Sequence, residues 1–139
     1  MRAVALALLL VAALVAGCGG DGDGADAEET VSTAISGLAA GDEKKVCDQL
    51  TVAAQRKILV FLADNPLGFP NIKATGCREA IDKLHAAFTP QQRNVLVDGE
   101  VGDAKLNGDR AKVRVIGAGM TADLQKIDGK WMIVGGLFQ

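Results

Sequence analysis

The sequence contains few of the residues that usually carry catalysis and metal binding. Its 139 residues include one histidine, His85, one tryptophan, Trp131, and no tyrosine. It has no Gly-x-Ser-x-Gly nucleophile elbow, no paired histidines at metal-binding spacing and no internal repeat. Of the three cysteines, Cys18 is assigned to lipid below, and the remaining Cys47 and Cys77 with His85 fall short of the four ligands of a structural zinc site. We therefore expect neither a metal nor another cofactor.

The sequence also lacks a strong charge of either sign. Its 15 basic and 17 acidic side chains leave a formal net charge of −2, and five of the acids lie between residues 21 and 29. No cluster of Lys and Arg interleaved with aromatic residues is present, since the aromatic residues are four Phe and one Trp. This composition argues against a nucleic-acid partner.

The N-terminus contains the longest apolar run, residues 3–16, behind a single basic residue, Arg2. Fourteen helical residues reach about 21 Å, which is short of the roughly 30 Å hydrocarbon core of a bilayer. A short apolar run that follows a positive charge and ends in small residues is typical of a secretory signal. We therefore expect residues 1–17 to be a signal peptide, with a buried N-terminal helix as the alternative.

The run ends in Val15-Ala16-Gly17-Cys18, which resembles the lipobox of bacterial lipoproteins. Valine stands at Val15, where leucine is commoner in that motif. The resemblance implies that the chain is cut before Cys18 and that lipid is attached to its thiol. The protein would then be exported and anchored to the outer face of the bacterial cell membrane, or to the outer membrane in a two-membrane cell.

The segment after Cys18 lacks the Lys of a phosphate loop, the spaced acids of a calcium loop and a base to activate a cysteine. Its glycines and acids are typical of a flexible, solvated linker. We expect residues 18–29 to form a lipidated Gly/Asp-rich tether and residues 30–139 to form a single domain.

With Cys18 assigned to lipid, Cys47 and Cys77 remain as an even pair in an exported chain. A disulfide closing that loop of about 30 residues is worth roughly 3–4 kcal/mol in the chain-entropy model. Two buried free thiols are the alternative.

The pattern of the domain changes from helical to extended along the chain. Apolar residues at helical spacing predict helices from residue 26 to Gly41, over 42–50, over 52–63 and from Cys77 to Pro90, with a loop over 64–76. Strands are predicted over 95–106, 110–117, 120–127 and 131–137, with hairpin turns at Asn107-Gly108 and Asp128-Gly129. The fold class expected is α+β, with N-terminal helices packed on an antiparallel four-strand meander.

The last predicted strand is apolar on both faces, which favours a cover on each side. Trp131, Ile133 and Leu137 alternate with Met132, Val134 and Phe138. One cover is the helical layer, and the other is a pocket lid or another subunit, which makes a homodimer through the sheet one of the expected assemblies.

Several segments resemble the lipid-anchored branch of the nuclear transport factor two-like superfamily. They are LAAGD at residues 38–42, the cysteine-bearing helix after it, the second cysteine at position 77, and LQKIDGKWMIVGGL at residues 124–137. The resemblance implies a cone-like fold, in which a curved antiparallel sheet wraps around N-terminal helices. Members include polyketide-cyclase-like enzymes, ketosteroid isomerases and non-catalytic domains that bind ligands or proteins, so the fold alone does not assign a function.

One motif suggests a nucleotide site, but its context excludes that interpretation. VRVIGAGMTA at residues 113–122 reads as a strand followed by G-x-G-x-x-A, yet too few residues follow for a βαβ unit with its acidic residue. We interpret these glycines as a bend or bulge between strands.

The remaining chemistry-bearing residues are candidates for a pocket in the cone. His85 is expected at the edge of an apolar helix stripe, and the pocket hypothesis groups it with Asp98, Glu100, Asp123 and Trp131. An isomerase-like site needs a carboxylate base and a Tyr or protonated acid as oxyanion donor, and the chain has no Tyr. We therefore expect a non-catalytic domain that binds a small apolar ligand or a protein, with an isomerase- or cyclase-like enzyme as the alternative.

Overall fold

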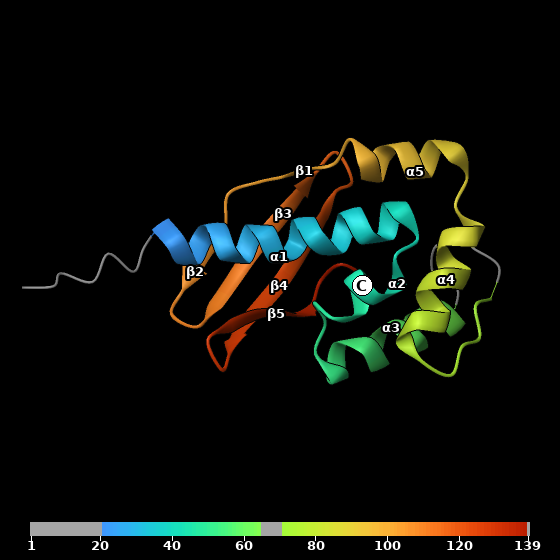
Figure 1. The fold of residues 1–139 in the computed structure, drawn as a ribbon, viewed down its shortest axis with the longest axis horizontal. Coiled ribbons are helices and arrows are strands. Elements are labelled where there is room, and N and C mark those ends of the chain that lie inside the picture. Colours follow the sequence, from blue (N-terminus) through green and yellow to red (C-terminus); the bar gives the residue numbers. More distant parts are fainter. Residues whose placement is uncertain (1–20, 65–70, 139) are drawn as a thin grey trace, which may run out of the picture.

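The computed structural model describes residues 21–64 and 71–138, and its helices precede its strands (Figure 1). The α+β class expected from the sequence is confirmed. The helices are α1 (Asp21–Ala40), α2 (Glu43–Cys47), α3 (Val52–Asp64), α4 (Cys77–Ala87) and α5 (Pro90–Val97). The strands are β1 (Glu100–Val101), β2 (Lys105–Asn107), β3 (Arg110–Ile116), β4 (Met120–Ile127) and β5 (Lys130–Gly135).

Helix α1 begins earlier than the sequence predicts. An extended tether was expected up to residue 29, but the chain is helical from Asp21. Two contacts join this early part to the domain: Asp23 forms an ion pair with Lys126 of β4 at 2.5 Å, and a Glu28 side-chain oxygen accepts a hydrogen bond from the Ala104 N–H at 2.8 Å. Acidic residues in the first turns also favour a helix through its macrodipole. These interactions outweigh the low helix propensity of the glycines.

Helix α5 takes the first three residues of the strand predicted over residues 95–106, and the rest of that strand is interrupted, so the prediction is wrong. Pro90 begins this helix, whereas from the sequence it was expected only to end the preceding one. Thr89 and Gln92 form a capping box, in which each side chain accepts a hydrogen bond from the other residue's N–H. Only the short strands β1 and β2 remain of the predicted strand.

The sheet is antiparallel, curled and four strands wide, because β1 and β2 pair with opposite ends of the same edge of β3. The predicted turns at Asn107-Gly108 and Asp128-Gly129 both join strands as expected. Gly117 and Gly119, in the motif that mimics a nucleotide loop, lie in the β3–β4 turn, where a bend or bulge was expected. The outer edge of β5 bonds to the chain around Leu50, through Ile133 N–H to Gln49 O at 2.8 Å and Thr51 N–H to Ile133 O at 3.1 Å.

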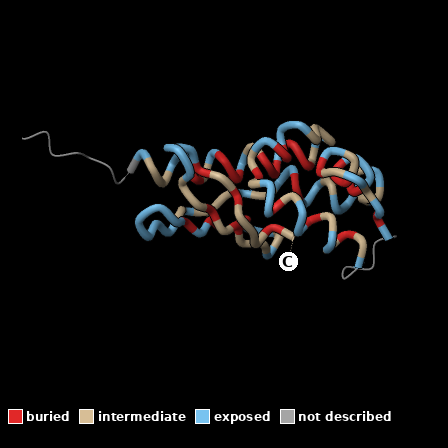
Figure 2. The backbone as a smooth tube through the Cα atoms, turned by 90° about the horizontal axis from the view of Figure 1, so that it is seen from below, coloured by how far each residue is buried: buried red, intermediate tan, exposed pale blue. Residues whose placement is uncertain are grey.

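The core lies between the sheet and the helices. Along β3, Ala111, Val113 and Val115 are buried, and the residues that alternate with them are exposed. Figure 2 shows α1, the first helix after the grey N-terminal trace, on one side of the strand layer. Trp131 and Ile133 of β5 lie in the same core, each no more than 2% exposed. One connected set of buried residues runs from Ala27 to Leu137.

Candidate functional site: an apolar groove at the helical end

The five residues grouped by the pocket hypothesis do not converge. Asp98 is the exposed C-cap of α5, and Glu100 is exposed in β1. Asp123 lies on the outer face of the sheet, whereas Trp131 is buried on the inner face, 2% exposed. His85 is in the last turn of α4. The structure therefore does not assemble the carboxylate, histidine and tryptophan into one site.

Two of these residues have partners that explain their positions. Asp123 accepts a hydrogen bond from the Lys112 ammonium at 2.8 Å, on the exposed face of two neighbouring strands. The Trp131 ring lies 5.8 Å from the Lys126 ammonium, and its Nε1 is buried with no hydrogen-bond partner among the described residues. Trp131 thus packs in the core beside a cation.

A groove lies instead at the end of the molecule where the helices meet the β3–β4 turn and the C-terminal segment. Its volume is about 270 Å³. Its floor consists of buried leucines, and its rim consists of residues that are half-buried or exposed. The lining residues are Leu38, Phe61, Leu62, Leu84, Phe88, Gln92, Val95, Leu96, Ala118, Met120, Leu137 and Phe138.

The described lining of this groove is almost entirely apolar. Three of the four phenylalanines of the chain, Phe61, Phe88 and Phe138, contribute to it. The one polar side chain in the described lining is Gln92, and this lining contains neither a carboxylate nor a histidine. Such a surface binds apolar groups by burial and offers an amide for one or two hydrogen bonds. It supplies no acid or base to a bound molecule.

His85 holds the helices around the groove in place. Its ring Nδ1 lies 3.0 Å from the Leu38 carbonyl oxygen, at the C-terminal end of α1. Its own carbonyl oxygen accepts a hydrogen bond from Arg93 Nη2 of α5 at 3.3 Å. Because Leu84 of α4 and Phe88, the residue after α4, lie on either side of His85 in the chain, these bonds fix the spacing of three groove walls. His85 is therefore a structural residue beside the groove.

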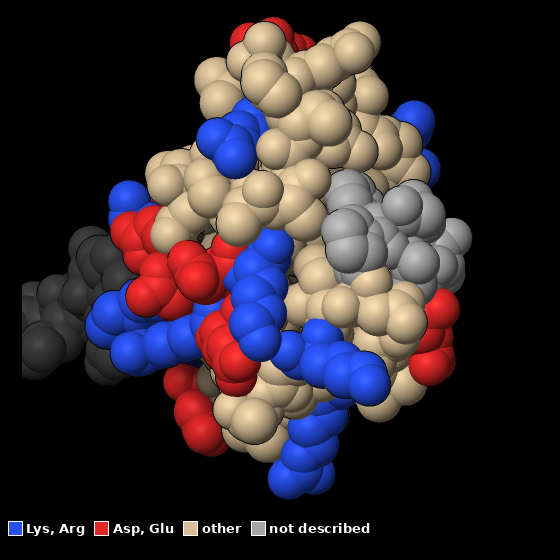
Figure 3. All heavy atoms as spheres, turned by 90° about the vertical axis from the view of Figure 1, so that its right-hand side faces the viewer, with Lys and Arg blue, Asp and Glu red and all other residues tan. Residues whose placement is uncertain are grey.

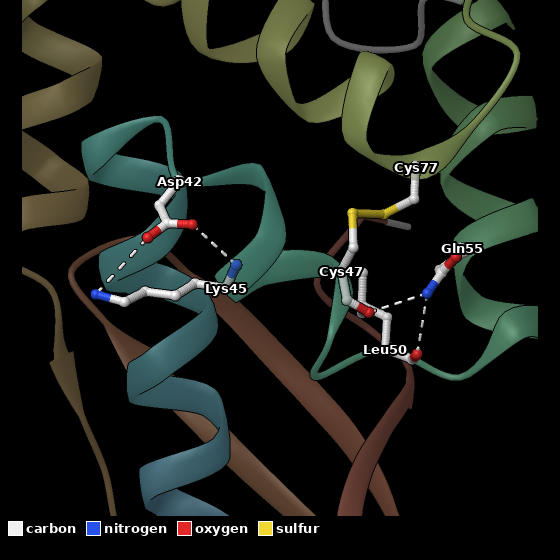
Figure 4. The surroundings of a disulfide bond; sticks show 6 residues. All are labelled: Asp42, Lys45, Cys47, Leu50, Gln55 and Cys77. Carbon is white, nitrogen blue, oxygen red and sulfur yellow. Dashed lines mark hydrogen bonds and ion pairs between the residues drawn. A yellow bond between two sulfur atoms is a disulfide. The ribbon is translucent and has the colours of Figure 1, made fainter.

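The predicted disulfide is present and joins the last residue of α2, Cys47, to the first residue of α4, Cys77 (Figure 4). Next to it, the Gln55 amide of α3 donates hydrogen bonds to the Cys47 and Leu50 carbonyl oxygens at 2.9 and 3.3 Å. Asp42 caps α2 by accepting from the Lys45 N–H. The three helices behind the groove are thus linked covalently and by hydrogen bonds.

At this end of the molecule, charged residues of both signs gather mainly in the lower part of the view, and the upper part is mostly uncharged (Figure 3). Two carboxyl groups there have lowered pKa values. The Lys83 ammonium, hydrogen-bonded at 2.6 Å, lowers the pKa of Glu79 to about 2, helped by the Thr75 N–H and hydroxyl. The Lys44 ammonium lowers the pKa of Asp48 by a similar bond. Both are exposed ion pairs within a helix turn, which is a structural arrangement.

Within residues 21–64 and 71–138, no group of three or more His, Cys, Asp or Glu side chains is arranged to hold a metal ion. None of the helices in those ranges has the length and hydropathy needed to span a bilayer. Cys18 and the predicted signal peptide lie outside the described residues.

The groove could not be identified from the sequence because its residues share no local motif. The lining residues come from separate parts of the chain and are brought together only by folding, as in the case of Leu38, Phe61, Phe88, Met120 and Phe138. The one available signal was Phe138, which the sequence analysis placed opposite Trp131 and proposed to be covered.

No protein-family model, curated protein or solved structure was found to match this chain.

Proposed function

We propose that this protein is an exported, lipid-anchored protein whose domain binds a small apolar ligand in the groove without transforming it. The observation that carries the proposal is the groove of about 270 Å³ with one polar side chain, Gln92, in its described lining. Ligand pockets typically occupy about 300–1,000 Å³ and are mostly apolar with a few polar groups. A volume just below that range suits a ligand of a few carbon rings or a short acyl chain.

The chemistry of the groove supports binding more than catalysis. The isomerase- or cyclase-like alternative requires a carboxylate within the cavity. The described lining contains none, and the three candidate carboxylates lie elsewhere: Asp98 and Glu100 are exposed, and Asp123 is paired with Lys112. The resemblance to the nuclear transport factor two-like superfamily is compatible with either activity, so the groove rather than the fold supports the choice.

The anchor is tested at Cys18. Replacing Cys18 with Ser removes the thiol to which lipid would be attached, so the variant should leave the membrane fraction and partition into the aqueous phase of a detergent extraction. Intact mass should show the acyl groups on the wild type only. A variant that stays membrane-bound would contradict lipidation, and the Cys47–Cys77 disulfide should be intact in both proteins.

Ligand binding is tested with N-phenyl-1-naphthylamine, an uncharged apolar dye whose fluorescence rises when it leaves water. Saturable binding should weaken at least about tenfold in Val95→Glu, which places a charge at the groove rim. Val95 is 43% exposed, so the change does not disturb the core. The matched control is Val97→Glu on the same helix, 68% exposed and absent from the groove lining. Equal effects of the two variants, or no saturable binding, would refute the proposal.

A further inference from the structure

The sheet has an outer face that carries an excess of basic residues. In β3, Arg110, Lys112 and Arg114 point away from the core and are exposed, and Lys105 of β2 is exposed on the same face. A hollow of about 650 Å³ lies over this face, lined by Lys105, Arg110 and Lys112 together with polar residues such as Asn107 and Gln125. Helix α1 packs on the opposite face (Figures 1 and 2).

The cations on this face are mutually unfavourable. Lys105 lies directly opposite Lys112 in the β2–β3 register, and like charges at such positions destabilise a sheet. The two carboxylates on the face are Asp123, which pairs with Lys112 at 2.8 Å, and Glu100 at the far end of β3. Lys105, Arg110 and Arg114 form no ion pair with any described residue. An anionic partner would relieve their repulsion.

Two packed copies of this face would bring the same cations together. Met132 and Val134, whose apolar side chains suggested a dimer through the sheet, are half-buried beside them. The charges therefore disfavour that assembly and favour a negatively charged surface as the partner.

The start of α1 indicates which surface is near. Asp21, the first helical residue, is three positions after Cys18, and three residues span at most about 10 Å. Gly24 lies beside Leu106 of β2, and Asp23 is paired with Lys126 of β4. Figure 1 shows the start of α1 at the same end as the β2–β3 and β4–β5 turns. A lipid on Cys18 would therefore hold this end of the sheet at the bilayer.

We propose that the outer face of the sheet, through Lys105, Arg110, Lys112 and Arg114, docks on the anionic headgroups of the bilayer that holds the anchor. The proposal depends on the lipid anchor proposed above. The hairpin tips at this end carry Asp109 and Asp128, so the basic face, not the tips, is the surface that complements anionic lipid. Each Lys or Arg near such a surface strengthens binding roughly fivefold. A lipid anchor and a basic patch together give stable attachment.

The ligand groove and the anchor lie far apart along the molecule. Helix α1 has 20 residues and is therefore about 30 Å long. Leu38, near its C-terminal end, lines the groove. The groove thus lies at the far end of the molecule from the anchor.

The test uses the chain from Gly19 onward, which lacks the anchor but contains the whole described core, Ala27 to Leu137. Binding is measured by co-sedimentation with vesicles of phosphatidylcholine alone or mixed equally with phosphatidylglycerol, in low salt and in 0.5 M salt (roughly a 4 Å screening length). We expect at least about tenfold tighter binding to the mixed vesicles, lost in high salt. The triple variant Arg110→Gln, Lys112→Gln, Arg114→Gln should lose this preference.

The matched control is Arg56→Gln, Lys57→Gln, Arg78→Gln, which removes the same charge from exposed positions on α3 and α4. This control should change vesicle binding less than about threefold. Equal losses of binding in the two triple variants would show that binding depends only on the net charge of the protein, and would overturn the proposal. The proposal would also be overturned if the protein bound both kinds of vesicle equally well. Binding to double-stranded DNA without a preference for phosphatidylglycerol would overturn it too. Because the chain from Gly19 onward carries no lipid, a failure of vesicle binding leaves the result of the Cys18→Ser experiment unaffected.

Discussion

At the scale of single residues, the clearest pH-dependent contribution is that of Glu79. Its pKa is lowered to about 2 by the hydrogen bond from Lys83 and the two from Thr75. A carboxyl group with a lowered folded-state pKa stabilises the fold above its unfolded value, near 4.5, and loses that contribution as the pH falls towards 2. Stabilisation by Glu79 should therefore be complete at pH 6 and decline between pH 4.5 and 2.

The variant Glu79→Gln tests this expectation, because an amide does not titrate in that range. Urea denaturation at a series of pH values should show the wild type more stable than Glu79→Gln at pH 6, with the difference shrinking as the pH falls to 2. Asp82→Asn, on the same helix, is the control, since Asp82 forms no ion pair with any described residue. A wild-type advantage that persists unchanged at pH 2 would contradict the assignment.

Gly136 is a residue that no side chain can replace. Its φ is +90°, and a Cβ there would lie 2.0 Å from the Thr121 carbonyl oxygen and 3.0 Å from the Asp123 nitrogen. The chain turns at this point from β5 towards Leu137 and Phe138, which line the groove. Gly136 therefore positions the C-terminal wall of the groove.

The substitution Gly136→Ala should destabilise the protein by about 3 kcal/mol or more, because the backbone contact must be broken as well as the positive φ strained. Gly108→Ala is the matched control: its φ is +61° and no atom lies within 4 Å of the added Cβ. It should cost only about 1–2 kcal/mol. Equal losses of unfolding free energy in the two variants would show that the close approach to Thr121 is not maintained.

At the scale of elements, the sequence predicted those whose apolar spacing is regular and failed where two signals overlap. Helix α4 and strands β3 and β4 follow from their periodicity. The run Val95-Leu96-Val97 imitates a strand, but Thr89 and Gln92 three residues apart were an available sign of a helix start. Pro90 was used only as a stop, although proline is common in the first turn of a helix.

The start of α1 could not be predicted from local sequence. Gly22 and Gly24 disfavour a helix, and the contacts that stabilise it, Asp23 with Lys126 and Glu28 with Ala104, join residues 76 or more positions apart. The groove also depends on contacts between distant residues, since its walls come from elements distributed over the whole domain. Of the long-range contacts, only the Cys47–Cys77 disulfide could be identified from the sequence, by counting cysteines: once Cys18 is assigned to lipid, only one pair remains.

That disulfide should contribute strongly to the association of α2 with α4. The double variant Cys47→Ser, Cys77→Ser removes a link across 30 positions and should lower the free energy of unfolding by about 3–4 kcal/mol. Denaturation of the wild type with a reductant should give the same loss. If thiol labelling before reduction detects two reactive groups in the wild type, the bond is absent.

At the scale of the whole molecule, the sheet and helices share one core and divide the surface into regions with different properties. The groove lies where α1 ends, the basic face lies on the outer side of the sheet, and the start of α1 lies beside the hairpin turns. A rigid α1 beginning three residues after Cys18 replaces the long flexible tether expected from the sequence. The ligand groove and the proposed lipid anchor would therefore lie at opposite ends of one domain.

A single core also predicts that the domain unfolds as one unit. Trp131, the only tryptophan, reports on the packing of α1 against the sheet: it is 2% exposed, and its carbonyl oxygen accepts a 3.5 Å hydrogen bond from the Thr30 hydroxyl. Circular dichroism at 222 nm reports mainly on the helices, including α3 and α4 at the other end. Because Ile58, Leu62 and Leu84 belong to the same buried set as Trp131, the two signals should change together.

In urea, tryptophan fluorescence and circular dichroism should therefore give the same midpoint and the same slope for the oxidised protein. In the variant without the disulfide, both midpoints should fall by the same amount, because α4 is still packed against α1 through the His85–Leu38 contact. Loss of helical signal at lower urea than loss of the tryptophan signal would show that the groove end unfolds independently. In that case the groove would be a separate module, and its proposed ligand would stabilise only that end of the protein.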